Sequence, residues 1–165
     1  TNSLNMPVEA VEHEYPLMVE EYCLINGSCG SGKHRGGMGV AREVRTLSDH
    51  TTFSGRADSF ITAAEGYGGG LAGSHCRIIR NYGSQTEEVM APKQKLISLV
   101  AGERIRMETP GGGGLGNPAE RSVDDLAMDL EDERISLSRA RQDYGDDLVE
   151  KALGVLSKPI PKKEF

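Results

Sequence analysis

Three clusters of glycine restrict what this chain can fold into more than any other feature of the sequence. They lie at residues 27–39, 66–73 and 111–116, and they hold most of the 21 glycines among the 165 residues. Glycine loses more conformational freedom on folding than any other residue, so close packing must offset the entropy lost when these segments become ordered. They are therefore expected in turns or in closely packed irregular backbone that a Cβ atom would disrupt.

The segments between the clusters have the patterns of β-strands. Strands are predicted at residues 16–25, 40–47, 75–80, 95–100 and 104–108. In the last of these, Ile105 and Met107 are predicted to lie on one face of the strand. The charged residues of the same segment are predicted to lie on the other face.

After residue 118 the apolar spacing changes to that of amphipathic helices. Ser122 is a predicted helix N-cap with Asp125 three residues later, and further helices are predicted at residues 136–144 and 147–156. The predicted fold class is α+β, mainly β with ordered glycine-rich loops, followed by a short helical C-terminal region. The predicted divisions are a glycine-rich β domain at 1–118, a helical region at 119–157 and a loose tail at 158–165.

Composition excludes several classes of protein. The net charge is −6, and the acidic residues gather between 120 and 147, where they are predicted to form a solvated surface. No basic patch suited to nucleic acid is present, and apolar runs such as residues 96–101 are too short to span a membrane. With no export signal at the start and three Cys without framework spacing, we expect reduced thiols and a cytoplasmic location.

One motif resembles a phosphate-binding loop. Residues 27–33 fit the pattern G-x-x-x-x-G-K, but His34 stands where Ser or Thr would hold magnesium. The glycine-rich residues after His34 are a poor start for a helix. A glycine-rich β connection is the favoured interpretation, and no nucleotide is expected on this chain alone.

The sequence offers weak evidence for a metal site or a nucleophile. The soft metal ligands are scattered, without paired C-x-x-C spacing; they are Cys23, Cys29, His34, His75 and Cys76. No G-x-S-x-G motif is present. We therefore expect no metal on this chain and assign no catalytic residue.

Several motifs occur in an order that is similar to one known family. They lie at residues 5–12, 15–17, 30–43, 56–58, 66–70, 109–118 and 136–145. As a set they resemble the hydantoinase B/5-oxoprolinase family, which includes subunits of acetone and acetophenone carboxylases. Since the family's B-type subunit is much longer than this chain, the resemblance places these residues in its C-terminal part.

The resemblance implies partners and a chemistry. An A-type subunit with an ATP module is expected to work with the front part of the B-type subunit, which carries the family's metal ligands. ATP and a divalent metal are thus expected on partner subunits, and no cofactor on this chain. The implied function is a part of an ATP-dependent complex that opens cyclic amides, and the isolated chain is expected to be inactive. The alternatives are a subunit of an ATP-dependent ketone carboxylase and a non-catalytic structural or assembly module.

The candidate residues are structural or interfacial. They are Arg35, Gly36, Gly37, Gly39, Arg56, Asp58, Gly111, Gly112, Gly113 and Gly114. Arg35 either reaches carbonyls or a carboxylate on a neighbouring subunit or is a solvent-exposed turn residue. The glycines are expected to be ordered and packed against backbone, although residues 109–118 also have an interpretation as a flexible linker.

Overall fold

The chain forms two compact units, each assembled from segments that are separate in the sequence. The computed structural model describes residues 5–157. The first unit holds the residues up to 24, 40–62 and 75–109, and the second holds 25–39, 63–74 and the residues from 110 onward. The boundary predicted from the sequence lies at residue 118, whereas the contacts group the glycine-rich segments with the helical region. The predicted loose tail lies outside the described residues.

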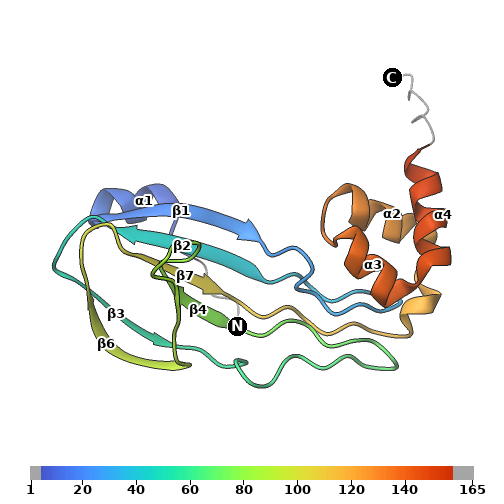
Figure 1. The fold of residues 1–165 in the computed structure, drawn as a ribbon, viewed down its shortest axis with the longest axis horizontal. Helices are drawn as coiled ribbons and strands as arrows, with labels where there is room; N and C mark the ends of the chain where they lie inside the picture. The colour runs from blue at the N-terminus through green and yellow to red at the C-terminus, as the bar shows by residue number, and fades with distance from the viewer. Residues whose placement is uncertain (1–4, 158–165) are drawn as a thin grey trace. The chain divides into compact units, whose positions relative to one another are not determined.

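The first unit is built from two antiparallel sheets (Figure 1). The larger has the strand order β1-β2-β7-β4-β5, and the smaller pairs β3 with β6. The elements are α1 (Val8–Glu14), β1 (Leu17–Leu24), β2 (Val40–Thr46), β3 (Thr51–Arg56), β4 (Arg77–Arg80), β5 (Glu88–Val89), β6 (Lys93–Leu99) and β7 (Arg104–Glu108). All five predicted strands are confirmed, as β1, β2, β4, β6 and β7, while α1, β3 and β5 were not predicted.

The apolar core of the first unit involves both sheets. Its buried residues are Ile78, Met90, Leu99 and Ile105, with Phe53 packed against them. Ile105 and Met107 line one cavity together with residues of β3 and β6, so the predicted common face of these two side chains is confirmed. No helix within residues 5–157 has the length and the apolar character needed to cross a membrane.

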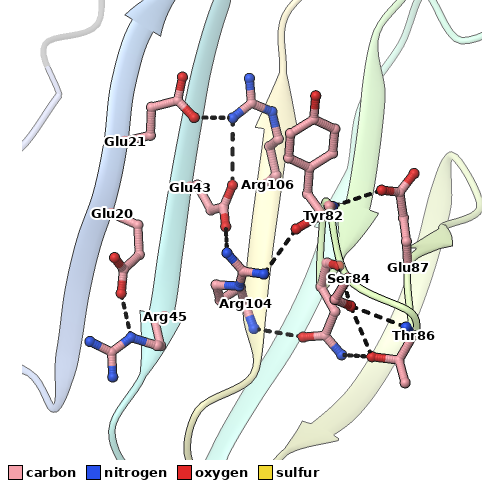
Figure 2. Close-up of polar contacts among 12 residues, drawn as sticks. Glu20, Glu21, Glu43, Arg45, Tyr82, Ser84, Thr86, Glu87, Arg104 and Arg106 are labelled. Atoms are coloured by element: carbon pink, nitrogen blue, oxygen red, sulfur yellow. Dashed lines mark hydrogen bonds and ion pairs between the residues drawn. The ribbon is translucent and has the colours of Figure 1, made fainter.

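The opposite face of the larger sheet carries a network of charged side chains (Figure 2). Arg106 donates to Glu108 at 2.8 Å and also to Glu21, and its Nη1 lies 3.5 Å from a carboxylate oxygen of Glu43. Arg104 lies 3.0 Å from the other oxygen of Glu43. Arg106, Glu43 and Glu108 are all buried, which is tolerable because each charge has a partner of opposite sign.

The second unit ends in a small helical region. It consists of the 3₁₀ turn η1 (Pro118–Glu120) and the helices α2 (Val123–Glu131), α3 (Leu137–Tyr144) and α4 (Asp146–Leu156). The side chain of Ser122 accepts a hydrogen bond from the Asp125 N–H, which confirms the predicted N-cap. Gly145 separates α3 from α4 at a φ of 83°, a conformation that favours glycine.

The helical region has an apolar core of its own. The fully buried members include Leu126, Ala140, Val149 and Ala152. Because α2 and α4 both contribute to this cluster, the 3.6-residue apolar spacing in the sequence marks the faces that pack together. The predicted change from alternating to helical periodicity after residue 118 is therefore confirmed.

Truncation of one core side chain should destabilise the helical region. Leu126 is 0% exposed, so Leu126→Ala should lower the free energy of unfolding by about 3 kcal/mol through lost burial and an unfilled cavity. The control is Met128→Ala on the same helix, where the side chain is 54% exposed and the expected loss is within about 0.5 kcal/mol. Urea unfolding followed by circular dichroism measures both. Equal losses in the two variants would contradict the packing described here.

The charged network should make the fold sensitive to acid. Hydrogen bonds from the Cys23 thiol and from Arg106 lower the pKa of Glu21 below its ordinary value. A carboxyl group with a lowered pKa in the folded state stabilises the fold above its unfolded pKa, and it loses that contribution as the pH falls through the lowered value. The free energy of unfolding should therefore decline below about pH 4.3.

The test is urea unfolding across a pH series. Glu21→Gln should reduce the decline at acid pH, because glutamine carries no titrating carboxylate. Glu14→Gln, at an exposed position of α1, is the control and should leave the decline unchanged. A decline of the same size in E21Q and in the unsubstituted chain would refute this role of Glu21.

Candidate functional site

The three glycine-rich segments of the second unit lie side by side and are joined by backbone hydrogen bonds. Gly30 N–H donates to the Gly112 carbonyl at 2.8 Å, and Leu71 N–H donates to the Ser31 carbonyl at 2.7 Å. Gly114 N–H donates to the Leu71 carbonyl at 2.9 Å. Each segment is thus bonded to the other two, and we call this arrangement (residues 25–39, 63–74 and 110–117) the glycine bundle.

The bundle is too tight for side chains at many of its glycines. A Cβ atom built there would lie 1.9–2.2 Å from a carbonyl oxygen of a neighbouring segment, at Gly30, Gly36, Gly70, Gly73, Gly111, Gly113 and Gly114. Backbone atoms cannot turn aside as the end of a long side chain can. Glycine is therefore required at these positions by close backbone approach.

The other predicted glycines have looser surroundings. A Cβ atom at Gly112 would lie 3.1 Å from the Gly37 nitrogen, and one at Gly37 would have no atom within 4 Å. Gly39 N–H donates to the Ser28 hydroxyl at 2.8 Å. Arg56 and Asp58 are exposed residues of the first unit, at the end of β3 and just after it, so they belong to a different unit from the remaining candidates.

A buried carboxylate lies beside the bundle. Asp129 of α2 is 2% exposed. It is shared by three guanidinium groups: Arg35 Nε lies 2.8 Å from Oδ1, Arg134 Nη1 lies 3.4 Å from Oδ1, and Arg121 donates to Oδ2. We call Asp129 and these three arginines the arginine cluster. It ties the bundle segment that carries Arg35 to α2 and to the residues on both sides of that helix.

Arg35 therefore pairs with a carboxylate of its own chain, that of Asp129. Burial alone would lower the pKa of Arg35, but the hydrogen bond and the charge of Asp129 outweigh it and raise that pKa. Arg35 Nη1 also donates to the Gly36 carbonyl at 3.1 Å. The guanidinium remains charged and its direction is fixed by two different contacts.

Sequence reasoning missed most of this cluster. The acidic helical region was predicted to be a solvated surface, and this is wrong for Asp129 and also for Asp143, whose side chain is 4% exposed. A usable signal was present, because Asp129 follows the core residue Leu126 by three positions and so shares its helix face. Asp143 accepts a hydrogen bond from the Ser31 hydroxyl at 2.7 Å, which joins α3 to the bundle.

The cluster borders an open cavity of about 390 Å³. The lining residues are His34, Arg35, Gly36, Gly37, Arg121, Asp125, Met128, Asp129 and Arg134. All of them belong to the second unit. Two of the predicted glycines and the predicted arginine are thus brought together with four charged side chains of the helical region.

The motif that resembles a phosphate loop lies inside the glycine bundle. His34 forms an isolated bridge with Leu115, and no helix follows it in residues 35–39. Lys33 lies 3.4 Å from Glu120. The backbone of this segment is thus held by the neighbouring segments and lacks the helix N-terminus that cradles phosphate in such loops.

Two of the three cysteines are poorly suited to nucleophilic chemistry. The hydrogen bond to Glu21 raises the pKa of the Cys23 thiol, and burial raises the pKa of the Cys76 thiol. Both groups are therefore thiols near neutral pH, whereas the thiolate is the reactive form. In residues 5–157 no three side chains of His, Cys, Asp or Glu come together in a way that could hold a metal ion.

Comparison with known proteins identifies related chains. The family model described as Hydantoinase B/oxoprolinase matches residues 1–118. The B subunit of a putative D-/L-hydantoinase from Pseudomonas sp. (strain NS671) is 36% identical over 87% of this chain and 24% of its own length. The beta chain of caprolactamase from Pseudomonas jessenii is 30% identical over 84% of this chain and 24% of its own length. The chain thus spans about a quarter of the length of these relatives.

Two solved structures share the fold. The ATP-dependent caprolactamase from Pseudomonas jessenii aligns with 90% of this chain and 27% of its own, with a TM-score of 0.71 and 27% sequence identity. Nucleotide-free acetone carboxylase aligns with 94% of this chain and 27% of its own, with a TM-score of 0.71 and 18% identity. The resemblance inferred from the sequence motifs is confirmed.

The packing of the glycine bundle predicts opposite results for alanine substitutions at two adjacent glycines. In Gly36→Ala the new Cβ would lie 2.0 Å from the Gly112 oxygen, so the variant should lose about 3 kcal/mol of stability or fail to fold. Gly37→Ala, where the space is open, should change stability by less than about 0.5 kcal/mol. Thermal and urea unfolding of the two variants provide the measurement. If both alanines are tolerated equally, the bundle is looser than described.

Proposed function

This chain belongs to the hydantoinase B/oxoprolinase family, and we propose that it works as part of an ATP-dependent complex that opens cyclic amides with water. The observation that carries the proposal is the combined sequence and structural similarity to caprolactamase and to a B-type hydantoinase chain. Both relatives are named for action on cyclic amides. The mature complex would contain the remaining parts of a B-type subunit and an A-type subunit.

The chain's own chemistry supports a scaffolding role within such a complex. The Cys23 and Cys76 thiols have raised pKa values, and the buried carboxylates of both units are engaged by arginines. These groups are committed to the fold and are not free to attack an amide. We propose, from the family resemblance, that ATP and a divalent metal bind to the partner subunits, and that the isolated chain is inactive.

The glycine bundle gives that scaffold its rigidity. Backbone packed directly on backbone has no side-chain rotamers to rearrange, so we expect the segment around Arg35 to be rigid. The same packing means that few substitutions of these glycines would preserve the fold. A rigid element of this kind suits a subunit that positions its neighbours.

Two other functions are compatible with the family. The ketone carboxylase alternative rests on the acetone carboxylase structure, but identity of 18% supports the fold alone. The amide reaction is favoured because relatives above 30% identity are named as hydantoinase and 5-oxoprolinase proteins. The alternative from another class is a structural or assembly module that binds the same partners without being needed for turnover.

Reconstitution is the experiment that separates these functions. The chain is co-expressed with an A-type subunit and the front part of a B-type subunit from the same source, and the complex is isolated by size-exclusion chromatography with light scattering. We expect a stable assembly far above the 17.8 kDa of the chain. ATP-dependent ring opening is then measured with hydantoin, 5-oxoproline and caprolactam, and ketone carboxylation with acetone and bicarbonate.

The matched control is the same preparation without this chain. Loss of ring opening in the control supports the proposal, while acetone consumption in place of ring opening supports the carboxylase. Full activity in the control would identify a structural module. A monomer that hydrolyses cyclic amides by itself would overturn the proposal.

A further inference from the structure

We propose that the cavity beside the arginine cluster binds a small oxyanion, the carboxylate or phosphate group of a ligand. The cavity is lined by Arg35, Arg121 and Arg134, and all three guanidinium groups share the carboxylate of Asp129. One carboxylate balances one positive charge. The cluster therefore attracts further negative charge.

The nearby acids offset the excess only in part. Arg134 has a second partner in Asp132 at 2.6 Å, and this side chain is 48% exposed. Arg35 and Arg121 have Asp129 as their carboxylate partner, so three cations face two anions in direct contact. Asp125 also lines the cavity, but it is exposed and its charge is screened by water and salt. An anion within the cavity would complete the pairing of the buried charges.

The arginines of the cluster have N–H groups that are not used in hydrogen bonds within the chain. A guanidinium carries five N–H groups, and Arg35 uses two of its nitrogens, for Asp129 and for the Gly36 carbonyl. Arg121 donates to Asp129 and to the Lys33 carbonyl, and its buried Nε has no hydrogen-bond partner within the described part of the chain. The side chains of Arg35 and Arg134 are 23% and 33% exposed, so both reach solvent at the cavity. Planar arginine forks suit carboxylate and phosphate groups, which accept paired hydrogen bonds.

The shape of the cavity fits a ligand larger than the anion itself. Its volume of about 390 Å³ lies at the lower end of the range for small-molecule sites. Gly36 and Gly37 line one side of it, and Gly37 has open space where a side chain would stand. Met128 lines the cavity and is 54% exposed, so it offers an apolar contact beside the charged groups.

The cavity alone supports an oxyanion site, and the proposed function adds two sources of the anion. Opening a cyclic amide with water produces a carboxylate, and ATP hydrolysis produces phosphate. Acetate and inorganic phosphate therefore serve as separate probes. Neither probe requires an active enzyme, so the binding test can succeed or fail independently of the proposed reaction.

The experiment is thermal unfolding of the full 165-residue chain followed by circular dichroism. Sodium phosphate and sodium acetate are compared with sodium chloride at equal ionic strength. At about 20 mM, the preferred oxyanion should raise the Tm by about 3 °C relative to chloride, because a ligand that binds the folded state stabilises it. A rise with phosphate alone identifies a phosphate site, and a rise with acetate alone identifies a carboxylate site.

Variants tie the effect to the cavity. Arg35→Gln and Arg134→Gln should each abolish the rise, and the use of two variants guards against misfolding of one. Arg141→Gln is the control, because Arg141 belongs to the same helical region and pairs with Asp146 and Glu150 but does not line the cavity. Equal effects of all three salts, or an unchanged rise in R134Q, would overturn the proposal.

Discussion

The close approach of three backbone segments in the glycine bundle is the constraint on which the second unit depends. A hydrogen bond such as Gly30 to Gly112 at 2.8 Å brings whole peptide units together without intervening side chains. The entropy lost in ordering glycine is large, and the bundle offsets it with hydrogen bonds and with backbone contact on several sides. The density of glycine is thus a requirement of the packing and does not indicate flexibility.

The arginine cluster extends this packing to the helices. Asp129 lies on the inward face of α2, and its contact with Arg35 joins that helix to the bundle. Ser31 and Asp143 make a second connection, to α3. The helical region is small, and its apolar core is supplemented by these polar links. Asp129 is the critical member, because its loss would leave the buried guanidinium of Arg121 without a carboxylate partner.

Charge pairing recurs in the first unit in a different setting. Arg106 and Glu43 lie on neighbouring strands of the larger sheet and are buried among other charged residues (Figure 2). The apolar core lies on the opposite face of the same sheet. A sheet with a paired ionic face and an apolar face keeps its register, because a slip by one residue would place charges in the core. In both units, therefore, buried ion pairs accompany a modest apolar core.

The sequence by itself determined the family, the fold class and most of the secondary structure. Alternation marked β7 and 3.6-residue spacing marked α2, because these periods depend on local backbone geometry that each segment sets for itself. The helix α1 and the strands β3 and β5 were not predicted, and β5 has only 2 residues, too few to show a periodicity. Order in the glycine clusters was also expected, although residues 109–118 had an alternative interpretation as a flexible linker.

Only the tertiary structure decided what the charged residues do. Arg35 was open to two interpretations, and the partner it contacts, Asp129, lies 94 residues further along the chain. The same helix carries exposed acids such as Asp124, so composition could not single out the one that is buried. Likewise Gly36 and Gly37 are adjacent glycines, yet a Cβ atom would meet the backbone of a neighbouring segment at Gly36 and open space at Gly37. Contacts between distant segments fix these differences, and such contacts leave no local periodicity in the sequence.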